Sequence, residues 1–275
     1  MPRYKLIACD LDETLLDHDH KIPEHVVAAI AAAREQGVRF VPSTGRPFGT
    51  IVDVLERLGV DGCADEYVMS FNGGCLTRNS SPKPLESSSF PHEAAEAIWA
   101  YGREHDMCVH AYTLDPVYIL NYYDWERAYI EGRMNNVETT ASDLGFIQNE
   151  TITKVLLASL DATELDATEA ALRDVSDKFG LDVVRSSGRY LEFNPAGVNK
   201  GAGLLRLAER LGIAAEDTIA IGDSSNDISM IRAAGLSCCV ANATPETRAE
   251  ADYVCRLDNN AGGVAEVIEK FVLGA

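Results

Sequence analysis

Short apolar runs alternate with helix-spaced apolar residues through the first third of the chain. The run from Tyr4 to Cys9 predicts a buried strand. Between Pro23 and Gly37, apolar residues recur on one helical face, so this segment predicts a helix that begins and ends at those residues. The alternation predicts a parallel sheet with helices on both faces. The elements that continue it are a strand at 38–41, a helix at 51–58 and a strand at 67–71, followed by a turn at 72–74.

The pattern changes at the Ser/Pro-rich segment 79–84, which is typical of a linker. The next hundred residues predict a separate α+β domain, with helices near 92–104 and 163–179 and strands near 107–112, 117–121, 152–160, 182–186 and 189–193. After Pro195 the α/β alternation returns, with helices at 199–211, 227–233 and 262–272 and strands at 218–221 and 236–240. The expected fold class is therefore α/β, with a core domain formed by 1–83 and 193–275 and an inserted domain at 84–192.

Composition narrows the possible functions. The chain has 275 residues, of which 46% are hydrophobic, as in a folded globular protein. It has 24 Lys and Arg against 43 Asp and Glu, a net charge of −19 that disfavours binding to nucleic acid or to an anionic membrane. No apolar run approaches the ~18–20 residues that cross a bilayer, and no signal peptide is evident, so we expect a cytoplasmic protein without nucleic-acid or membrane partners. The seven cysteines form no CxxC pair, which disfavours a zinc ribbon or a thioredoxin-like site.

Two aspartates, Asp10 and Asp12, directly follow the first predicted strand. In extended chain, residues two apart point to the same side, so both carboxylates are expected to face one site if the strand geometry continues. Paired carboxylates are hard oxygen ligands suited to Mg²⁺. One of them can also serve as a nucleophile while the other performs acid–base chemistry.

Three further segments carry candidate chemistry. At the end of the second strand, Thr44, Gly45 and Arg46 offer a hydroxyl, a flexible backbone and a cationic fork to a phosphate. Lys200 begins a predicted helix, a position that favours anions over fixed cations, and is explained if it meets an anion.

The last segment follows the strand at 218–221. Asp223 and Asp227 offer oxygen ligands there, and Asn226 can orient a carboxylate or a lysine. All four segments lie at carboxyl ends of predicted parallel strands or at adjoining helix starts, the edge at which open α/β sheets bind ligands. Each segment alone is compatible with an ordinary turn, and it is their conjunction that predicts a site.

The ordered segments DLDETLL, STGRP, GVNKG and GDSSNDISMI resemble the haloacid dehalogenase superfamily. Within it, the chain is similar to the Cof-type phosphatases, whose Rossmann-like core carries an inserted α/β cap of the IIB type. The segments at 71–74, 240–243 and 262–265 also look like segments of that family. The resemblance covers nearly the whole chain.

The resemblance implies specific roles. Asp10 would be the nucleophile that forms an aspartyl-phosphate, and Asp12 would protonate the leaving oxygen and then activate water. Thr44 and Lys200 would hold the transferring phosphoryl group. The cofactor would be Mg²⁺, held by Asp10, the backbone carbonyl of Asp12, and Asp223.

Several other residues receive supporting roles from the same resemblance: Asp227 at the metal site, Arg46, Asn72 and Asn242 near the substrate, and Gly45 and Asn226 as supporting residues. One departure is visible, because Glu13 stands where the family most often has glycine. An acidic side chain there either points away or alters the local field.

The expected function is hydrolysis of a small phosphorylated metabolite, such as a sugar phosphate, with the inserted domain contacting the leaving group. A sugar phosphomutase is an alternative reading, as is a phospho-acceptor regulator of the receiver type. The insertion and the Asp10/Asp12 pair disfavour the regulator, because a stable switch needs no acid–base group beside its nucleophile. A non-catalytic binding protein is least compatible, since every expected catalytic position is filled.

Overall fold

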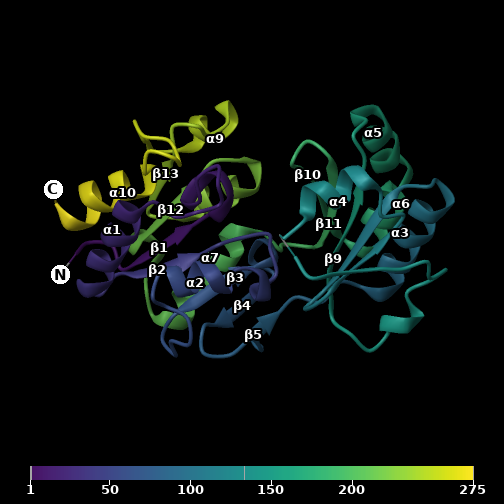
Figure 1. The fold of residues 1–275 in the computed structure, drawn as a ribbon, viewed down its shortest axis with the longest axis horizontal. Helices are drawn as coiled ribbons and strands as arrows, with labels where there is room; N and C mark the ends of the chain where they lie inside the picture. Colours follow the sequence, from purple (N-terminus) through teal and green to yellow (C-terminus); the bar gives the residue numbers. More distant parts are fainter. Residues whose placement is uncertain (1, 133, 275) are drawn as a thin grey trace. The chain divides into compact units, whose positions relative to one another are not determined.

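The computed structural model describes residues 2–132 and 134–274 (Figure 1) and divides the chain into two compact units. The first unit is formed by Met1–Glu86 with Asn199–Ala275, and the second by Ser87–Val198. The sequence placed the insertion at 84–192. The first boundary lies later because β5 (Pro84–Ser87) joins a sheet of the first unit, and the second because β11 (Tyr190–Pro195) continues the sheet of the second unit.

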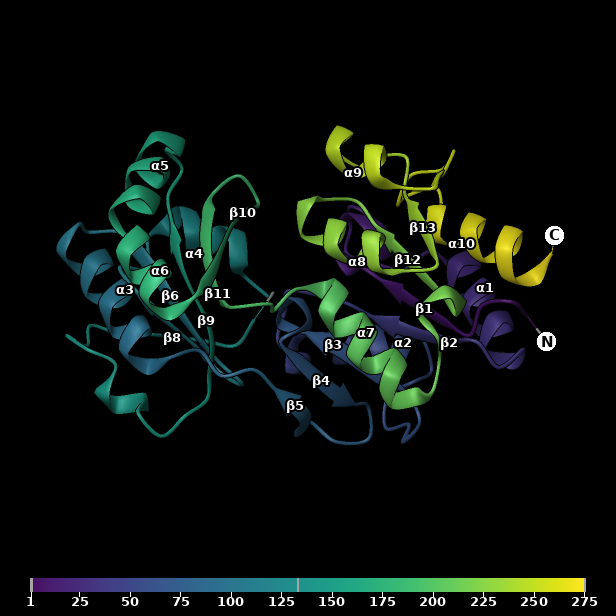
Figure 2. The same ribbon diagram turned by 180° about the vertical axis from the view of Figure 1, so that it is seen from behind.

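The first unit is built on a parallel five-stranded sheet in the order β14-β13-β12-β1-β2. Alternate residues of β1 point to opposite faces. Ile7 and Cys9 pack among α1, α2 and α10, whereas Leu6 and Ala8 pack against α7 and α8 (Figures 1 and 2), which confirms the predicted α/β class. The strands are β1 (Leu6–Cys9), β2 (Arg39–Pro42), β12 (Thr218–Gly222), β13 (Leu236–Cys239) and β14 (Tyr253–Val254). The helices are α1 (Glu24–Glu35), α2 (Val52–Arg57), α7 (Lys200–Leu211), α8 (Ile228–Ala233), α9 (Pro245–Glu250) and α10 (Gly263–Ile268).

The third predicted strand does not extend this parallel sheet as a full member. β3 (Tyr67–Ser70) pairs antiparallel with β4 (Cys75–Arg78) in a separate sheet of order β3-β4-β5. It meets the parallel strands through one bridge, between Ser43 and Met69. Phe71 and Asn72 adopt positive φ angles of 51° and 53° and reverse the chain directly after β3, which explains why β3 pairs with β4.

The second unit contains a six-stranded sheet in the order β10-β11-β9-β6-β7-β8. Its pairings are antiparallel except for β7 with β8. One face carries an apolar cluster that includes Trp99, Val155 and Phe193. The remaining strands are β6 (Cys108–Thr113), β7 (Val117–Leu120), β8 (Asn136–Glu138), β9 (Ile152–Ala158) and β10 (Leu181–Ser186), and the helices are α3 (His92–Glu104), α4 (Asp124–Ile130), α5 (Ala162–Ala171) and α6 (Arg173–Phe179).

Three features of this unit differ from the sequence prediction. The short strand β8 was not expected. The helix expected over 163–179 is broken at Leu172 into α5 and α6. The hydroxyls of Thr168 and Ser176 bond back to carbonyls four residues earlier, a contact that weakens or bends helices. Helix α4 was not expected, because its buried residues are Glu126 and Ile130 and its inward face is therefore half polar.

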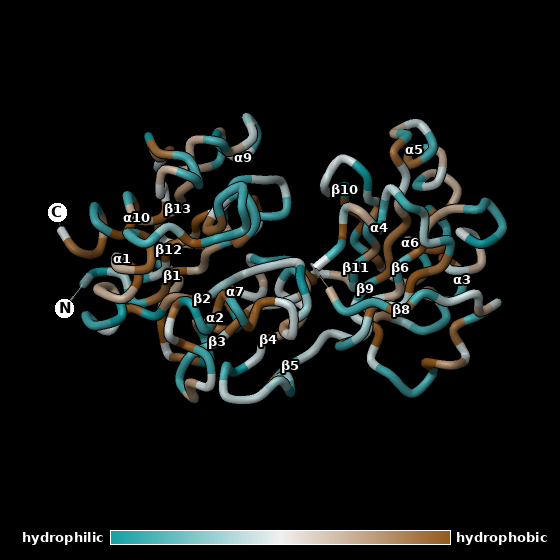
Figure 3. Tube along the Cα trace, in the orientation of Figure 1, coloured by the Kyte–Doolittle hydropathy of each residue, from teal (hydrophilic) through white to brown (hydrophobic). Residues whose placement is uncertain are grey.

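Hydrophobic segments run along the strands of each unit (Figure 3), in agreement with the buried clusters. Among the residues that the structure describes, no helix has the length and apolar character needed to span a membrane.

Candidate active site

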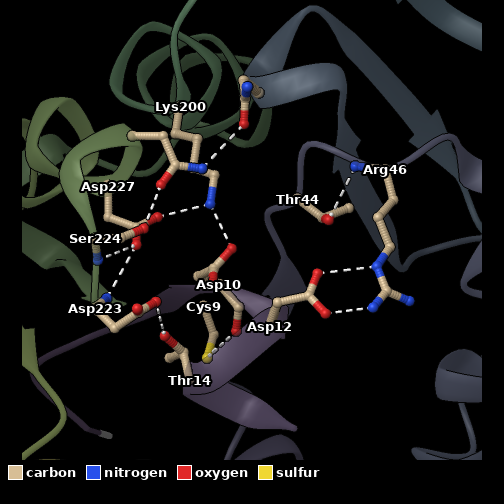
Figure 4. A network of polar contacts seen from close by, with 12 residues as sticks. Cys9, Asp10, Asp12, Thr14, Thr44, Arg46, Lys200, Asp223, Ser224 and Asp227 are labelled. Atoms are coloured by element: carbon tan, nitrogen blue, oxygen red, sulfur yellow. Dashed lines mark hydrogen bonds and ion pairs between the residues drawn. The ribbon is translucent and has the colours of Figure 1, made fainter. Parts of the chain in front are cut away.

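The site is assembled at one edge of the parallel sheet of the first unit. Asp10 directly follows β1, Thr44 lies two residues beyond the end of β2, and Asp223 directly follows β12. Lys200 is the first residue of α7. Figure 4 shows these side chains together in one network of polar contacts.

Lys200 connects two of the carboxylates. Its ammonium group donates hydrogen bonds to Asp10 Oδ1 and, at 2.6 Å, to Asp227 Oδ1, and its side chain is fully buried. Burial opposes the charge, but the neighbouring carboxylates raise the pKa of Lys200, so the side chain remains an ammonium ion. A cation at the beginning of a helix is thus explained by the anions that it meets. Asn199 caps the helix, because its Oδ1 accepts a hydrogen bond of 2.9 Å from the backbone N–H of Ala202.

Asp227 is held on both carboxylate oxygens. While Oδ1 accepts from Lys200, Oδ2 accepts from the backbone N–H groups of Asp223 at 3.0 Å and Ser224 at 3.1 Å. The close approach requires glycine at position 222, because a Cβ atom there would lie 2.5 Å from the Asp227 Cβ. Asp227 therefore fixes the turn after β12 and orients Lys200.

Asp223 has a different environment, because it is only partly buried. Thr14 donates a hydrogen bond of 2.9 Å from its hydroxyl to Asp223 Oδ1. Burial and the neighbouring Asp227 raise the pKa of Asp223 to about 6. Thr14 is a site residue that was not predicted from the sequence, although its position in the same short segment as Asp10 was a usable signal. Burial likewise raises the pKa of Asp10 well above its ordinary value, and Lys200 opposes that shift.

Asp12 does not share the partner of Asp10. Asp12 keeps extended backbone angles (φ −71°, ψ 130°), and the chain turns at the next residue, Glu13, where φ is 58°. The Asp12 carboxylate instead faces Arg46, which donates from Nε to Oδ2 at 2.9 Å and from Nη2 to Oδ1 (Figure 4). Asp10 and Asp12 lie in the same network of Figure 4, but they bind different cations, Lys200 and Arg46.

The turn after β2 holds Thr44, Gly45 and Arg46, and it lies beside Asn72. The Thr44 hydroxyl accepts a hydrogen bond of 3.1 Å from the backbone N–H of Arg46. Asn226 donates to the side-chain oxygen of Asn72 at 3.3 Å. That oxygen would lie 3.2 Å from a Cβ at Gly45, so a larger residue there would press on Asn72. Asn72 and Asn226 thus connect the turns that follow β3 and β12.

Asn242 and Glu13 form a separate, exposed contact next to the segment that carries Asp10 and Asp12. Asn242 is exposed and donates at 2.7 Å to the backbone carbonyl of Glu13, while its own oxygen accepts at 3.1 Å from the backbone N–H of Asn259. The Glu13 side chain is about half exposed and lies 3.3 Å from His18 Nε2. Its charge adds to the causes that raise the pKa of Asp223, after burial and Asp227, so it acts on the local field of the site. Its left-handed backbone explains why glycine suits this position.

Comparison with known proteins identifies the family. A family model described as haloacid dehalogenase-like hydrolase matches residues 7–268. The chain belongs to this family. The resemblance inferred from the four sequence segments is therefore confirmed.

Individual relatives of this hydrolase agree with that assignment. The putative phosphatase YxeH of Bacillus subtilis is 30% identical over 98% of this chain and 99% of its own length. A phosphoglycolate phosphatase of Methanothermobacter thermautotrophicus is also 30% identical, over 98% and 99% of the two chains. A crystal structure of a haloacid dehalogenase-like hydrolase from Bacteroides thetaiotaomicron has a TM-score of 0.82 at 30% identity, covering 97% of this chain and 99% of that one. These relatives confirm the expected enzyme class, a phosphoric monoester hydrolase.

The carboxylates of this hydrolase fit a divalent cation. Asp10, Asp223 and Asp227 each present an oxygen within 4.8 Å of the others. Lys200 bonds to two of these carboxylates, so one ammonium group serves three acidic groups, and a bound cation would relieve the repulsion between Asp223 and Asp227 that helps to raise the pKa of Asp223. Within the described part of the chain, the second oxygens of Asp10 and Asp223 accept no hydrogen bond, whereas both oxygens of Asp227 do. Asp10 and Asp223 are therefore the better ligands, and Asp227 supports them.

Proposed function

We propose that this hydrolase is a Mg²⁺-dependent phosphatase that hydrolyses a small phosphorylated metabolite through an aspartyl-phosphate on Asp10. One observation carries the proposal: a buried lysine holds the Asp10 carboxylate at the end of β1, beside two further carboxylates. A carboxylate nucleophile needs nearby positive charge to approach a phosphate dianion, and this arrangement provides it.

The first half of the reaction uses Asp10 as the nucleophile. Its carboxylate attacks phosphorus while Lys200, whose pKa is raised by its neighbours, stabilises charge on the phosphoryl oxygens. The Thr44 hydroxyl adds a donor at the end of β2. Asp10, the backbone carbonyl of Asp12, and Asp223 would hold Mg²⁺, which would supply further positive charge to offset the repulsion between carboxylate and phosphate.

Asp12 serves both halves of the reaction. It donates a proton to the leaving oxygen as the aspartyl-phosphate forms, and then accepts a proton from the water that hydrolyses it. Its carboxylate is 42% exposed, so water and substrate can reach it, in contrast to the buried Asp227. One group can perform both steps because the leaving group departs before the water attacks.

The relatives support a small phosphorylated substrate without selecting one. Two of them are named for phosphoglycolate and for 5-amino-6-(5-phospho-D-ribitylamino)uracil, at 30% and 29% identity. Both compounds carry a phosphate monoester, and the groups attached to it are different. The chemistry that they share is therefore cleavage of that ester.

The test is release of inorganic phosphate from a panel of phosphorylated metabolites in the presence of Mg²⁺. We expect Asp10→Asn to abolish turnover, because an amide is a poor nucleophile, and Asp12→Asn to lower it by ~10²–10⁴-fold. Exhaustive chelation should stop the reaction. Asp53→Asn, at an exposed position on α2, is the matched control and should retain full activity. Normal turnover by Asp10→Asn, or undiminished turnover after chelation, would contradict the proposal.

A further inference from the structure

Arg46 forms an ion pair with Asp12, the residue that is proposed to transfer protons. Its Nε donates to Asp12 Oδ2 at 2.9 Å and its Nη2 donates to Asp12 Oδ1, so the planar guanidinium meets the planar carboxylate at two points. The Arg46 side chain is 15% exposed, which makes it the more deeply placed member of the pair. A two-point contact fixes the plane of the carboxylate as well as its position.

The turn that carries Arg46 is itself fixed. The Arg46 backbone N–H donates to the Thr44 hydroxyl at 3.1 Å, and its carbonyl accepts from the backbone N–H of Phe71 at 3.4 Å. Pro47 follows directly and restricts the backbone at its own position. The guanidinium group therefore extends from a fixed backbone. It lies on the same turn as Thr44, whose hydroxyl is proposed to donate a hydrogen bond to the phosphate.

Asp12 has little else to hold it. In the described residues, the other basic side chain within ion-pair distance of its carboxylate is His20, whose Nδ1 lies 4.0 Å from Oδ1 and beyond hydrogen-bond distance. An aspartate side chain that is 42% exposed would sample several rotamers without a partner. A proton donor must stay within about 3 Å of the leaving oxygen, so such freedom would cost rate.

We propose that Arg46 is a positioning residue that acts through Asp12, rather than a ligand of the substrate phosphate. The inference rests on the proposed function, because it assigns Asp12 the acid–base role. It replaces the expectation from the sequence that Arg46 lies against the substrate. Each carboxylate oxygen keeps a second lone pair beside the bond from Arg46, so the held group can still carry or accept a proton.

The steps balance with Asp12 held in this way. In the first, the bond from Asp10 to phosphorus forms, the ester P–O bond breaks, and the Asp12 proton passes to the departing oxygen. In the second, a water oxygen bonds to phosphorus, the Asp10–phosphorus bond breaks, and a water proton returns to Asp12. Arg46 exchanges no proton in either step and only keeps the Asp12 carboxyl in place.

The experiment compares Arg46→Gln with the wild-type protein on an alkyl phosphate and an aryl phosphate. An alkoxide leaves only when protonated, whereas an aryl oxide departs with little help. We expect kcat/KM for the alkyl ester to fall by ~10²-fold and that for the aryl ester to fall by less than about threefold, because kcat/KM reports the steps up to leaving-group departure. Slower activation of water should also produce a burst of aryl alcohol of about one equivalent per enzyme.

The chain provides a matched control in Arg232→Gln. Arg232 makes the same two-point contact with Glu250, at 2.9 and 2.6 Å, on the exterior of α8 and α9 and away from the site. Arg232→Gln should leave the kcat/KM values for the alkyl and the aryl ester unchanged. Equal losses on the two esters for Arg46→Gln would overturn the positioning role, since a phosphate ligand contacts the part that both esters share. No phosphate release by the wild-type protein from any ester would instead overturn the proposed function, and this inference with it.

Discussion

His110 is a fully buried imidazole in the sheet of the second unit, on β6. Burial, assisted by the ammonium group of Lys154, lowers its pKa to about 3. Glu126, Cys108 and Tyr190 also face the ring, with the Glu126 carboxylate at 3.4 Å from Nε2 and the Cys108 sulfur at 3.5 Å. His110 is therefore neutral in the folded protein throughout the range in which a solvent-exposed histidine titrates.

The pKa of His110 is about 3 in the folded protein and about 6.5 in the unfolded chain, and this difference makes stability depend on pH. Below pH 6.5 the unfolded chain binds a proton at His110 and the folded chain does not, so stability is fully present above that pH and is lost as the pH falls toward 3. Between pH 7 and pH 5 the free energy of unfolding should fall by about 2 kcal/mol through this residue. Urea denaturation of the wild-type protein and His110→Gln at both pH values measures it. Identical pH slopes for the two proteins would show that His110 is not the cause.

Some site residues were predictable from the sequence and their pairings were not. Asp10, Lys200 and Asp223 lie next to predicted strands or at a predicted helix start, so local pattern was enough to single them out. The contact between Arg46 and Asp12 joins residues 34 positions apart on different turns. It depends on how residues 11–15 leave β1, which the spacing of two aspartates does not encode.

The start of α7 is the element that delivers Lys200 to the site. Gly201 lies against the neighbouring helix α8, and a Cβ atom there would be 2.2 Å from the backbone oxygen of Ser229. Backbone atoms on both sides have little freedom to move apart. The first turn of α7 therefore needs glycine next to the lysine so that the two helices can pack closely.

Gly201→Ala should consequently damage both stability and activity. We expect the free energy of unfolding to fall by about 1–3 kcal/mol, as for other overpacked sites, and turnover to fall because Lys200 shifts with the backbone. Gly49→Ala is the control, because nothing lies within 4 Å of a Cβ at that position. Chemical denaturation and phosphate release should be measured on both variants. If Gly201→Ala had the same free energy of unfolding and the same turnover as the wild-type protein, α7 and α8 would be able to separate without loss of stability.

Elements were predictable where one face is apolar and the ends carry clear signals. β1, α1 and α7 have these properties, and the structure places them close to the expected ranges. β3 and the turn after it were also found, but its antiparallel pairing with β4 was not, and this pairing follows from the positive φ angles of Phe71 and Asn72, which close a hairpin. An apolar run shows that a strand is buried and does not show which strand lies beside it.

At the scale of the whole molecule, each unit has its own hydrophobic core. Two apolar clusters cover the faces of the parallel sheet in the first unit, and a separate cluster that includes Trp99 fills the second. A unit with its own core can fold as a domain. Every residue proposed for the chemical step belongs to the first unit. Lys200 lies close to its boundary, directly after Asn199, the N-cap residue of α7.

This division predicts that the second unit governs substrate choice more than the chemical step. A short Gly/Ser linker from Glu86 to Asn199 would remove residues 87–198 and leave Asp10, Lys200 and Asp223 in place. Contacts remote from phosphorus help to position a large substrate, so their loss should lower both affinity and turnover for it. An aryl phosphate, whose leaving group departs readily, should lose least, and the preference among substrates should flatten. Circular dichroism must first show that the shortened chain folds. If the folded variant then kept the selectivity of the full chain, the residues that choose the substrate would lie in the first unit.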